Sequence, residues 1–144
     1  MKRVHEGRKA HCGDDLMNIK RVVTLLLHAF ASWLLCAATI GIGMALTTLD
    51  IALVVHAIAA PVFFGALSLL YFSRFNYTKP LATATVFVSF VMIVDFLIVG
   101  LLINRSLSMF TSLLGTWIPF ALIFVSTLIV GLAIQNRRYT ATAK

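Results

Sequence analysis

The chain has 144 residues, of which 60% are hydrophobic and 12% are charged, with a formal net charge of +7 and a mean hydropathy of +0.98. A soluble domain of this length has no interior large enough to bury so much apolar surface, so the composition excludes a soluble globular protein. The basic residues lie at the ends of apolar blocks, where they set topology and meet anionic headgroups, so the positive charge does not indicate nucleic-acid binding.

The N-terminal segment, residues 1–21, is polar and basic, and we expect it to form a disordered cytoplasmic tail. The stretch Met17-Asn18-Ile19-Lys20-Arg21 would itself be an ordinary start for a membrane protein. Translation from Met1 and translation from Met17 therefore both stay open.

Four long apolar blocks follow, over residues 22–46, 51–73, 81–103 and 113–134. A hydrocarbon core of ~30 Å needs ~20 helical residues, and each block meets that length. Because lipid offers no hydrogen-bonding partners, and because the blocks are continuously apolar, we predict helices and not strands. The sequence therefore predicts an all-α membrane protein, an antiparallel bundle of four transmembrane helices over residues 22–134, followed by a cytoplasmic tail over residues 135–144.

The basic residues divide unequally between the two sides of this predicted bundle. The first loop, Thr47–Asp50, contains no cation, so Arg105 stands alone on its side. The other side holds the remaining eleven of the twelve: Lys2, Arg3, Arg8, Lys9, Lys20, Arg21, Arg74, Lys79, Arg137, Arg138 and Lys144. The positive-inside rule then predicts a multi-pass protein of a bacterial or archaeal plasma membrane, with both termini in the cytoplasm.

The first helix has two different faces. Small residues recur every four positions at Ala37, Gly41 and Ala45, which favours close helix packing within the bundle or between the copies of a homo-oligomer. Trp33 lies near the midplane, and its N–H points into the bundle toward a carbonyl or hydroxyl group, or else the ring faces lipid. A polar stripe runs along the opposite face through Thr24, His28, Ser32, Cys36 and Thr39. It indicates a buried seam without defining a pathway, because serine and threonine can bond to the preceding turn.

Asp95 is the strongest functional signal, because an aspartate at mid-helix costs ~2.5–3.5 kcal/mol on insertion scales. Its own helix face is apolar, so its partner must come from another helix, or its carboxyl group is protonated. At ~1.5 Å per residue, His56 and Asp95 lie ~7.5 and ~12 Å from the outer ends of their helices. We therefore predict an intramembrane His56–Asp95 pair, with a neutral, hydrogen-bonded Asp95 as the alternative.

His28, Ser32 and Trp33 form a secondary candidate site. His28 lies ~17 Å in depth from His56, toward the cytoplasmic side. Two histidines that ligate one haem iron must each place a nitrogen ~2 Å from the metal, so these two cannot do so within one subunit. The simplest interpretation of His28 is a buried, hydrogen-bonded imidazole, and no spacing of histidines and cysteines matches a zinc site.

Three stretches carry a resemblance: residues 75–80 (FNYTKP), residues 94–96 (VDF) and residues 114–120 (LGTWIPF). They resemble segments of small hypothetical prokaryotic four-helix membrane proteins, and the resemblance covers roughly residues 22–134. It implies the fold class and no particular activity.

The sequence contains no nucleotide-binding glycine motif, zinc-protease motif or nucleophile elbow, so we lean against an enzyme. Our leading hypothesis is a proton-linked transport or permeation role centred on Asp95 and His56. One alternative is a redox membrane anchor that binds haem or quinone. The other is a structural or assembly subunit without its own chemistry.

Overall fold

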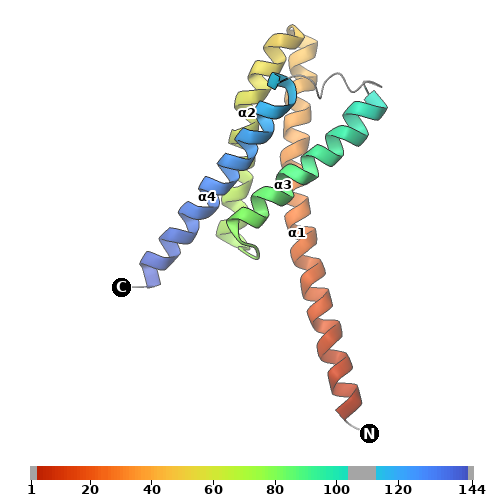
Figure 1. Cartoon of the computed structure of the whole chain (residues 1–144), viewed down its shortest axis with the longest axis vertical. Helices are drawn as coiled ribbons and strands as arrows, with labels where there is room; N and C mark the ends of the chain where they lie inside the picture. Colours follow the sequence, from red (N-terminus) through yellow and green to blue (C-terminus); the bar gives the residue numbers. More distant parts are fainter. Residues whose placement is uncertain (1–2, 104–112, 143–144) are drawn as a thin grey trace.

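The computed structural model describes residues 3–103 and 113–142, and helices dominate both segments (Figure 1). In chain order the elements are α1 (Arg3–Leu46), α2 (Leu49–Arg74), α3 (Pro80–Val94), the π-helical segments η1 (Asp95–Ile103) and η3 (Leu113–Trp117), and α4 (Ile118–Thr142). Among the described residues, the helices long and apolar enough to cross a membrane cover Asn18–Leu46, Leu49–Arg74, Pro80–Gly100 and Ile118–Ala141. The predicted all-helical architecture with four candidate spans is therefore confirmed.

Two helices are longer than the sequence predicts. Helix α1 begins at Arg3, where we expected a disordered tail over residues 1–21, and α4 continues to Thr142, well past residue 134. Starting a helix is unfavourable, whereas extending an existing one adds a hydrogen bond for each residue fixed. The helix is nucleated within each apolar span, and the flanking polar residues extend it.

Helix α2 is the central element of the bundle. It packs against α1 on one side and against α4 on the other, and α3 packs against α4 and crosses α1 (Figure 1). Helix α3 is inclined to the other helices, so its continuation η1 ends well away from the start of α4 in Figure 1. One part of the bundle is therefore closely packed around α2, and the far part of α3 is not.

Close helix contacts occur at two glycines. A Cβ atom on Gly131 would lie 2.7 Å from Cβ of Pro80 and 2.8 Å from the ring of Phe72, so glycine is required where α4 meets the start of α3 and the end of α2. A Cβ atom on Gly43 would lie 2.9 Å from Cβ of Ala52, where α1 meets α2. Gly41, in the predicted small-residue stripe, has nothing within 4 Å of its would-be Cβ, so the stripe does not mark this contact.

The turn between α2 and α3 is defined by local backbone chemistry. Asn76 has a φ of 46°, a left-handed conformation that asparagine adopts more readily than most residues, and its N–H donates to the carbonyl of Tyr71 at 3.0 Å. Pro80 then opens α3 at the first helical position, where a missing N–H costs nothing. The chain is therefore reversed in direction over five residues between Arg74 and Pro80.

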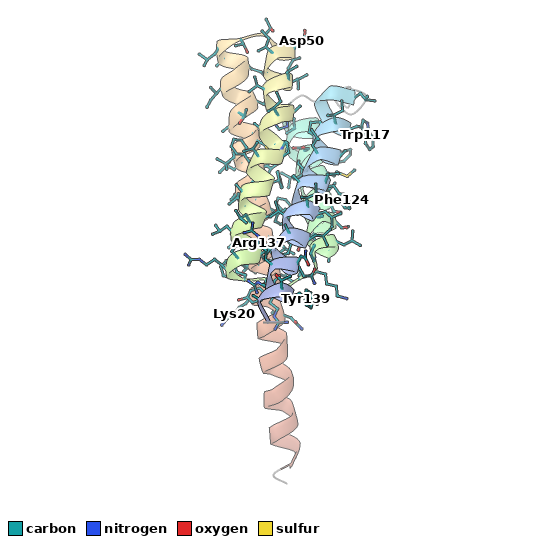
Figure 2. The ribbon with its side chains drawn as sticks, turned by 90° about the vertical axis from the view of Figure 1, so that its left-hand side faces the viewer. Lys20, Asp50, Trp117, Phe124, Arg137 and Tyr139 are labelled. Atoms are coloured by element: carbon teal, nitrogen blue, oxygen red, sulfur yellow. The ribbon has the colours of Figure 1, made fainter. Side chains whose placement is uncertain are left out.

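We call this end of the bundle the basic end, because α2 ends here, α3 begins here, and the apolar runs of α1 and α4 meet their polar flanks here. It carries the described cations Lys20, Arg21, Arg74, Lys79, Arg137 and Arg138. Figure 2 shows Lys20, Arg137 and Tyr139 at this end, with Asp50 at the opposite end, which we call the far end. The far end contains the turn Thr47–Thr48 between α1 and α2.

Candidate functional site

Asp95 lies at the point where α3 changes from α-helical to π-helical geometry. Its backbone N–H is shared between the carbonyls of Met92 and Val91, three and four residues earlier. Its side chain is half-buried. π-Helical turns are rare and are found frequently at functional sites, because they shift side chains out of the regular helical register. The π-helical backbone and the free-energy cost of inserting an aspartate at mid-helix therefore both single out Asp95.

The partner of Asp95 is Trp33. The indole Nε1–H of Trp33 donates to Oδ1 of Asp95 over 2.7 Å, which joins α1 to α3. Trp33 is only 9% exposed, and its ring stacks on Phe30 with centroids 5.9 Å apart. A hydrogen bond to an ionised carboxylate is shorter and stronger than one between neutral groups. Trp33 therefore points into the bundle, but its acceptor is the carboxyl group of Asp95 and not the predicted carbonyl or hydroxyl group.

His56 is buried against α1, with 9% of its surface exposed. Its imidazole is hydrogen-bonded to the backbone of Cys36, and its Nδ1 atom is buried with no hydrogen-bond partner. Because the N–H of a mid-helix residue is already used by the helix, the carbonyl of Cys36 is the backbone group that accepts this bond. The ring therefore has one nitrogen, Nδ1, buried inside the bundle without a partner.

Cys36 connects the two halves of this site. It is a free, buried cysteine, it lies on the same side of α1 as Trp33, and its thiol interacts electrostatically with Asp95. Trp33, Cys36, His56 and Asp95 together form what we call the Asp95 cluster. Sequence analysis placed Cys36 only in the polar stripe, and its spacing of three residues from Trp33 was the signal that could have placed it in the site.

The predicted direct pair between His56 and Asp95 does not form. No hydrogen bond or ion pair joins these two side chains, both of which lie within the described part of the chain. The depth estimate placed them at neighbouring levels, but each side chain bonds to a different residue of α1. His56 on α2 faces Cys36 of α1, and Asp95 on α3 faces Trp33 of α1.

His28 and Ser32 belong to a different environment, nearer the basic end. Nδ1 of His28 donates to the carbonyl of Thr24 at 2.8 Å, and the ring packs edge-on against Tyr71 and Phe75 at 5.5 Å each. Since Tyr71 follows His56 on α2 by ~22 Å of helix rise at ~1.5 Å per residue, the two histidines belong to separate sites. This agrees with the argument that they cannot share one haem iron.

The polar stripe of α1 is satisfied by its own backbone. Thr24 donates to the carbonyl of Lys20, Ser32 to that of His28 and Thr39 to that of Leu35, each at 2.8–2.9 Å. Each of these bonds runs back four residues along the same helix, as serine and threonine commonly do. The stripe is therefore a set of local bonds, and its described side chains form no chain of hydrogen bonds from one to the next.

A second polar network holds the basic end together. The Tyr71 hydroxyl is 2.9 Å from Oγ1 of Thr78, which is 2.6 Å from Oγ1 of Thr83 at the start of α3. The guanidinium of Arg21 lies 5.6 Å from the ring of Tyr77, a cation–π distance. These contacts tie the turn after α2 to the first turn of α3 and to α1.

Arg138 links α4 to the same region. Its Nη2 donates to the backbone carbonyls of Phe72 and Ser73 at 2.9 and 3.2 Å. The last carbonyls of a helix have no partners within the helix, and a cation there also complements the helix dipole. Arg138 therefore caps the end of α2, a role that sequence analysis missed because it counted this residue only toward topology.

Within the described residues, no group of three or more histidine, cysteine, aspartate or glutamate side chains is arranged to hold a metal ion. Comparison of the chain with protein-family models, with curated proteins and with solved structures gives no match. The fold and the Asp95 cluster therefore define the class to which we can assign the chain, a helical protein with four candidate membrane spans.

Proposed function

We propose that the protein is a multi-pass integral membrane protein whose four helices run antiparallel, with both termini on the cytoplasmic side of a bacterial or archaeal plasma membrane. The unequal distribution of lysine and arginine supports this orientation. The two-residue connection between α1 and α2 supports the antiparallel arrangement, since parallel neighbours need a long crossover. On this proposal the basic end faces the cytoplasm.

Within that protein, we propose a non-enzymatic, proton-linked transport or permeation role in which Asp95 gains and loses a proton. The observation that carries it is the Trp33–Asp95 hydrogen bond between α1 and α3, 2.7 Å long and formed by a carboxyl group within a membrane span. Intramembrane carboxylates and histidines are the groups that proton relays use. His56 bonds to Cys36, three residues along α1 from Trp33, and its buried Nδ1 has no partner and can take part in a proton relay.

Protonation of Asp95 would change the contact between α1 and α3. The ionised carboxylate only accepts hydrogen bonds, whereas the protonated group also donates one. The bond from Trp33 is strong in the first state and weaker in the second, because it loses its charge assistance. Since η1 leads away from the bundle beyond Asp95, the position of η1 is set in part by this bond (Figure 1).

The contacts also support one direction of proton access over the other. Toward the basic end, the stripe on α1 has its donors bonded to its own backbone, and the aromatic side chains of Tyr71 and Phe75 cover His28. Toward the far end, α3 and its continuation diverge from α4 (Figure 1). The arrangement therefore favours exchange between Asp95 and the far side of the membrane.

The test is proton flux into proteoliposomes that contain a pH-sensitive dye, measured for the native protein and for Asp95→Asn. The amide keeps an oxygen that can accept the Trp33 bond, so folding should survive while proton exchange is lost. We expect flux to fall to the level of protein-free vesicles. Equal flux in the native and Asp95→Asn proteins would contradict the proposal.

A structural or assembly subunit is the second candidate, and the same hydrogen bond favours it, because a satisfied aspartate can serve purely to hold α1 against α3. Thermal unfolding separates the two roles. A structural role predicts that Asp95→Asn lowers stability and leaves flux unchanged, whereas the proton-linked role predicts lost flux with stability close to native.

A further inference from the structure

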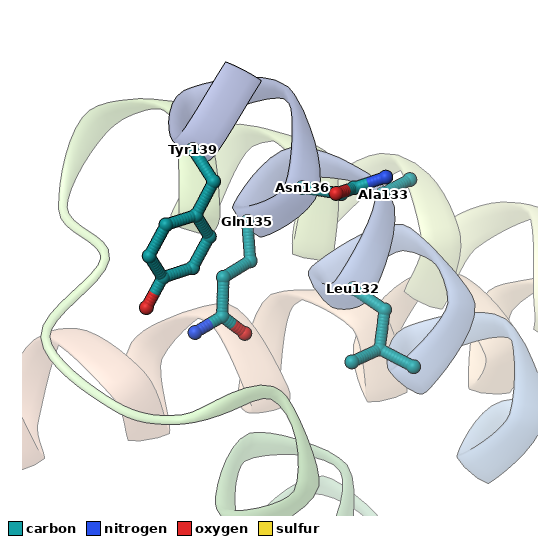
Figure 3. A pocket seen from close by; sticks show the side chains of 5 residues that line it. All are labelled: Leu132, Ala133, Gln135, Asn136 and Tyr139. Carbon is teal, nitrogen blue, oxygen red and sulfur yellow. The ribbon is translucent and has the colours of Figure 1, made fainter. Parts of the chain in front are cut away.

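Helix α4 has a shallow hollow at the basic end that neither the Asp95 cluster nor the hydroxyl network uses. It measures about 470 Å³ and is lined by Leu132, Ala133, Gln135, Asn136 and Tyr139 (Figure 3). The lining residues recur at spacings of three and four, so they share one face of the helix. The hollow lies where the apolar run of α4 gives way to polar and basic residues.

The chemistry of the hollow changes along the helix. Leu132 and Ala133 supply an apolar portion, and Gln135, Asn136 and Tyr139 supply amide and phenol groups closer to the end of α4. Figure 3 shows Gln135 and Tyr139 side by side, with their polar atoms extending away from the helix axis. From Leu132 to Tyr139 the helix rises ~10 Å at ~1.5 Å per residue, comparable to the polar layer on one side of a bilayer. The hollow therefore presents apolar side chains and then polar side chains, in the order in which an amphiphile presents its acyl chain and its headgroup.

The charge around the hollow selects an anionic amphiphile. Arg137 is exposed between Asn136 and Arg138, and Lys79, Arg74, Arg21 and Lys20 belong to the same end. Among residues whose side chains the structure describes, the carboxylates are Asp50, at the far end, and Asp95, within a span. No described acidic group therefore competes for these cations at the basic end.

The hollow is also held in place. Arg138, on an adjacent face of α4, is bonded to two carbonyls at the end of α2, and Gly131 packs against Pro80 and Phe72 about two turns earlier. A site on a frayed helix terminus would lose much of its binding energy in becoming ordered, and these contacts reduce that cost. The lining residues therefore lie on a segment that is already fixed to two other helices.

We propose that this hollow binds one anionic phospholipid, with an acyl chain along Leu132 and Ala133 and the phosphate diester at the amides of Gln135 and Asn136 and the hydroxyl of Tyr139. The amide and hydroxyl groups donate to the phosphate oxygens, and Arg137 supplies charge. The inference needs membrane insertion but not the proton-linked role, so it goes beyond the function proposed above.

The experiment is native mass spectrometry of the full chain in detergent, with phosphatidylglycerol or phosphatidylcholine added at equal concentration. Both lipids carry a phosphate, but only the first is anionic. We expect phosphatidylglycerol to be retained at least about fivefold more strongly, the factor expected for one basic residue near an anionic surface. Equal retention of the two lipids would overturn the proposal.

Variants locate the site. Gln135→Leu combined with Asn136→Leu should reduce phosphatidylglycerol retention to that of phosphatidylcholine, and Arg137→Gln should reduce it in part. Thr140→Val, on the exposed surface of α4 outside the hollow, and Arg105→Gln, which removes one charge assigned to the other side, should leave retention unchanged. Retention that survives the double substitution would overturn the assignment to this hollow.

Three further measurements keep the result unambiguous. Tyr139→Leu, at a side chain that is 67% exposed, replaces the double variant if the latter does not fold. Inorganic phosphate alone should not displace the bound lipid, and displacement would mean a free-phosphate site, against the proposal. Asp95→Asn should keep lipid retention intact, so failure of the lipid proposal and failure of the proton-linked role produce different results.

Discussion

The basic end and the far end of the bundle are held by different means. At the basic end all four helices are joined by polar contacts, through Arg21, Tyr71, Thr83 and Arg138. Toward the far end α1 and α2 stay in close contact at Gly43 and Ala52, but α3 leaves the bundle, and Trp33–Asp95 is the described side-chain hydrogen bond that joins it to α1. A helix fixed at one end and held by a single titratable contact beyond it can change its inclination when that contact changes.

The largest effect is expected at Gly131, where the basic end is tightly packed. We expect Gly131→Leu to lower the free energy of unfolding by about 3 kcal/mol, since added atoms would meet Pro80 and Phe72 at less than 3 Å. Thermal or denaturant unfolding in detergent measures this effect. Gly41→Leu is the matched control, because its would-be Cβ has nothing within 4 Å, and it should unfold like the native protein. Equal losses of unfolding free energy in the two variants would show that the close packing around Gly131 is not what stabilises the basic end.

A second effect, of about 2 kcal/mol, is expected for Trp33→Phe, which keeps an aromatic ring and removes the N–H that donates to Asp95. The measurement is a double-mutant cycle of unfolding free energies with Asp95→Leu, which, unlike Asp95→Asn, has no oxygen that can accept the bond. If the two residues act through their hydrogen bond, the double variant should lose much less than the sum of the single losses. Additive losses would show that the bond does not hold α3 to α1.

The smallest effect, about 1 kcal/mol, is expected for Arg138→Gln, which removes the cap from the end of α2. Hydrogen exchange of the backbone amides around residues 72–80 should also become faster, because the turn after α2 loses one of its ties. Arg137→Gln removes the same charge from the next position and should leave both measurements unchanged. Similar losses in the two variants would indicate a general charge effect in place of a specific cap.

The number and approximate limits of the spans could be predicted from sequence, because a bilayer demands a minimum apolar length and the chain meets it four times. The depth of Asp95 and His56 could be estimated in the same way, since helix rise is constant. Their direction around the helix axes could not. On helices that are apolar on nearly every face, the sequence carries little signal for which side meets which neighbour, so the bonds of both residues to α1 were not predicted.

The additional helix at both ends and the cap on α2 escaped prediction for a related reason. Arg138 and Phe72 are 66 positions apart, and nothing local to either residue indicates that they meet. The polarity of residues 1–21 favoured a disordered tail, but polarity alone does not decide between helix and coil when a long helix adjoins the segment.

The Arg138 cap has a consequence for how the protein is made. On the proposed insertion into a membrane, a chain made from its N-terminus completes α2 before α4, so the carbonyls of Phe72 and Ser73 would lack their guanidinium donor during that interval. Those carbonyls lie at the end of a span, where water can serve them in the meantime. Arg138 would then replace that water once α4 is in place, so the last helix of the chain would complete the hydrogen bonding at the end of α2.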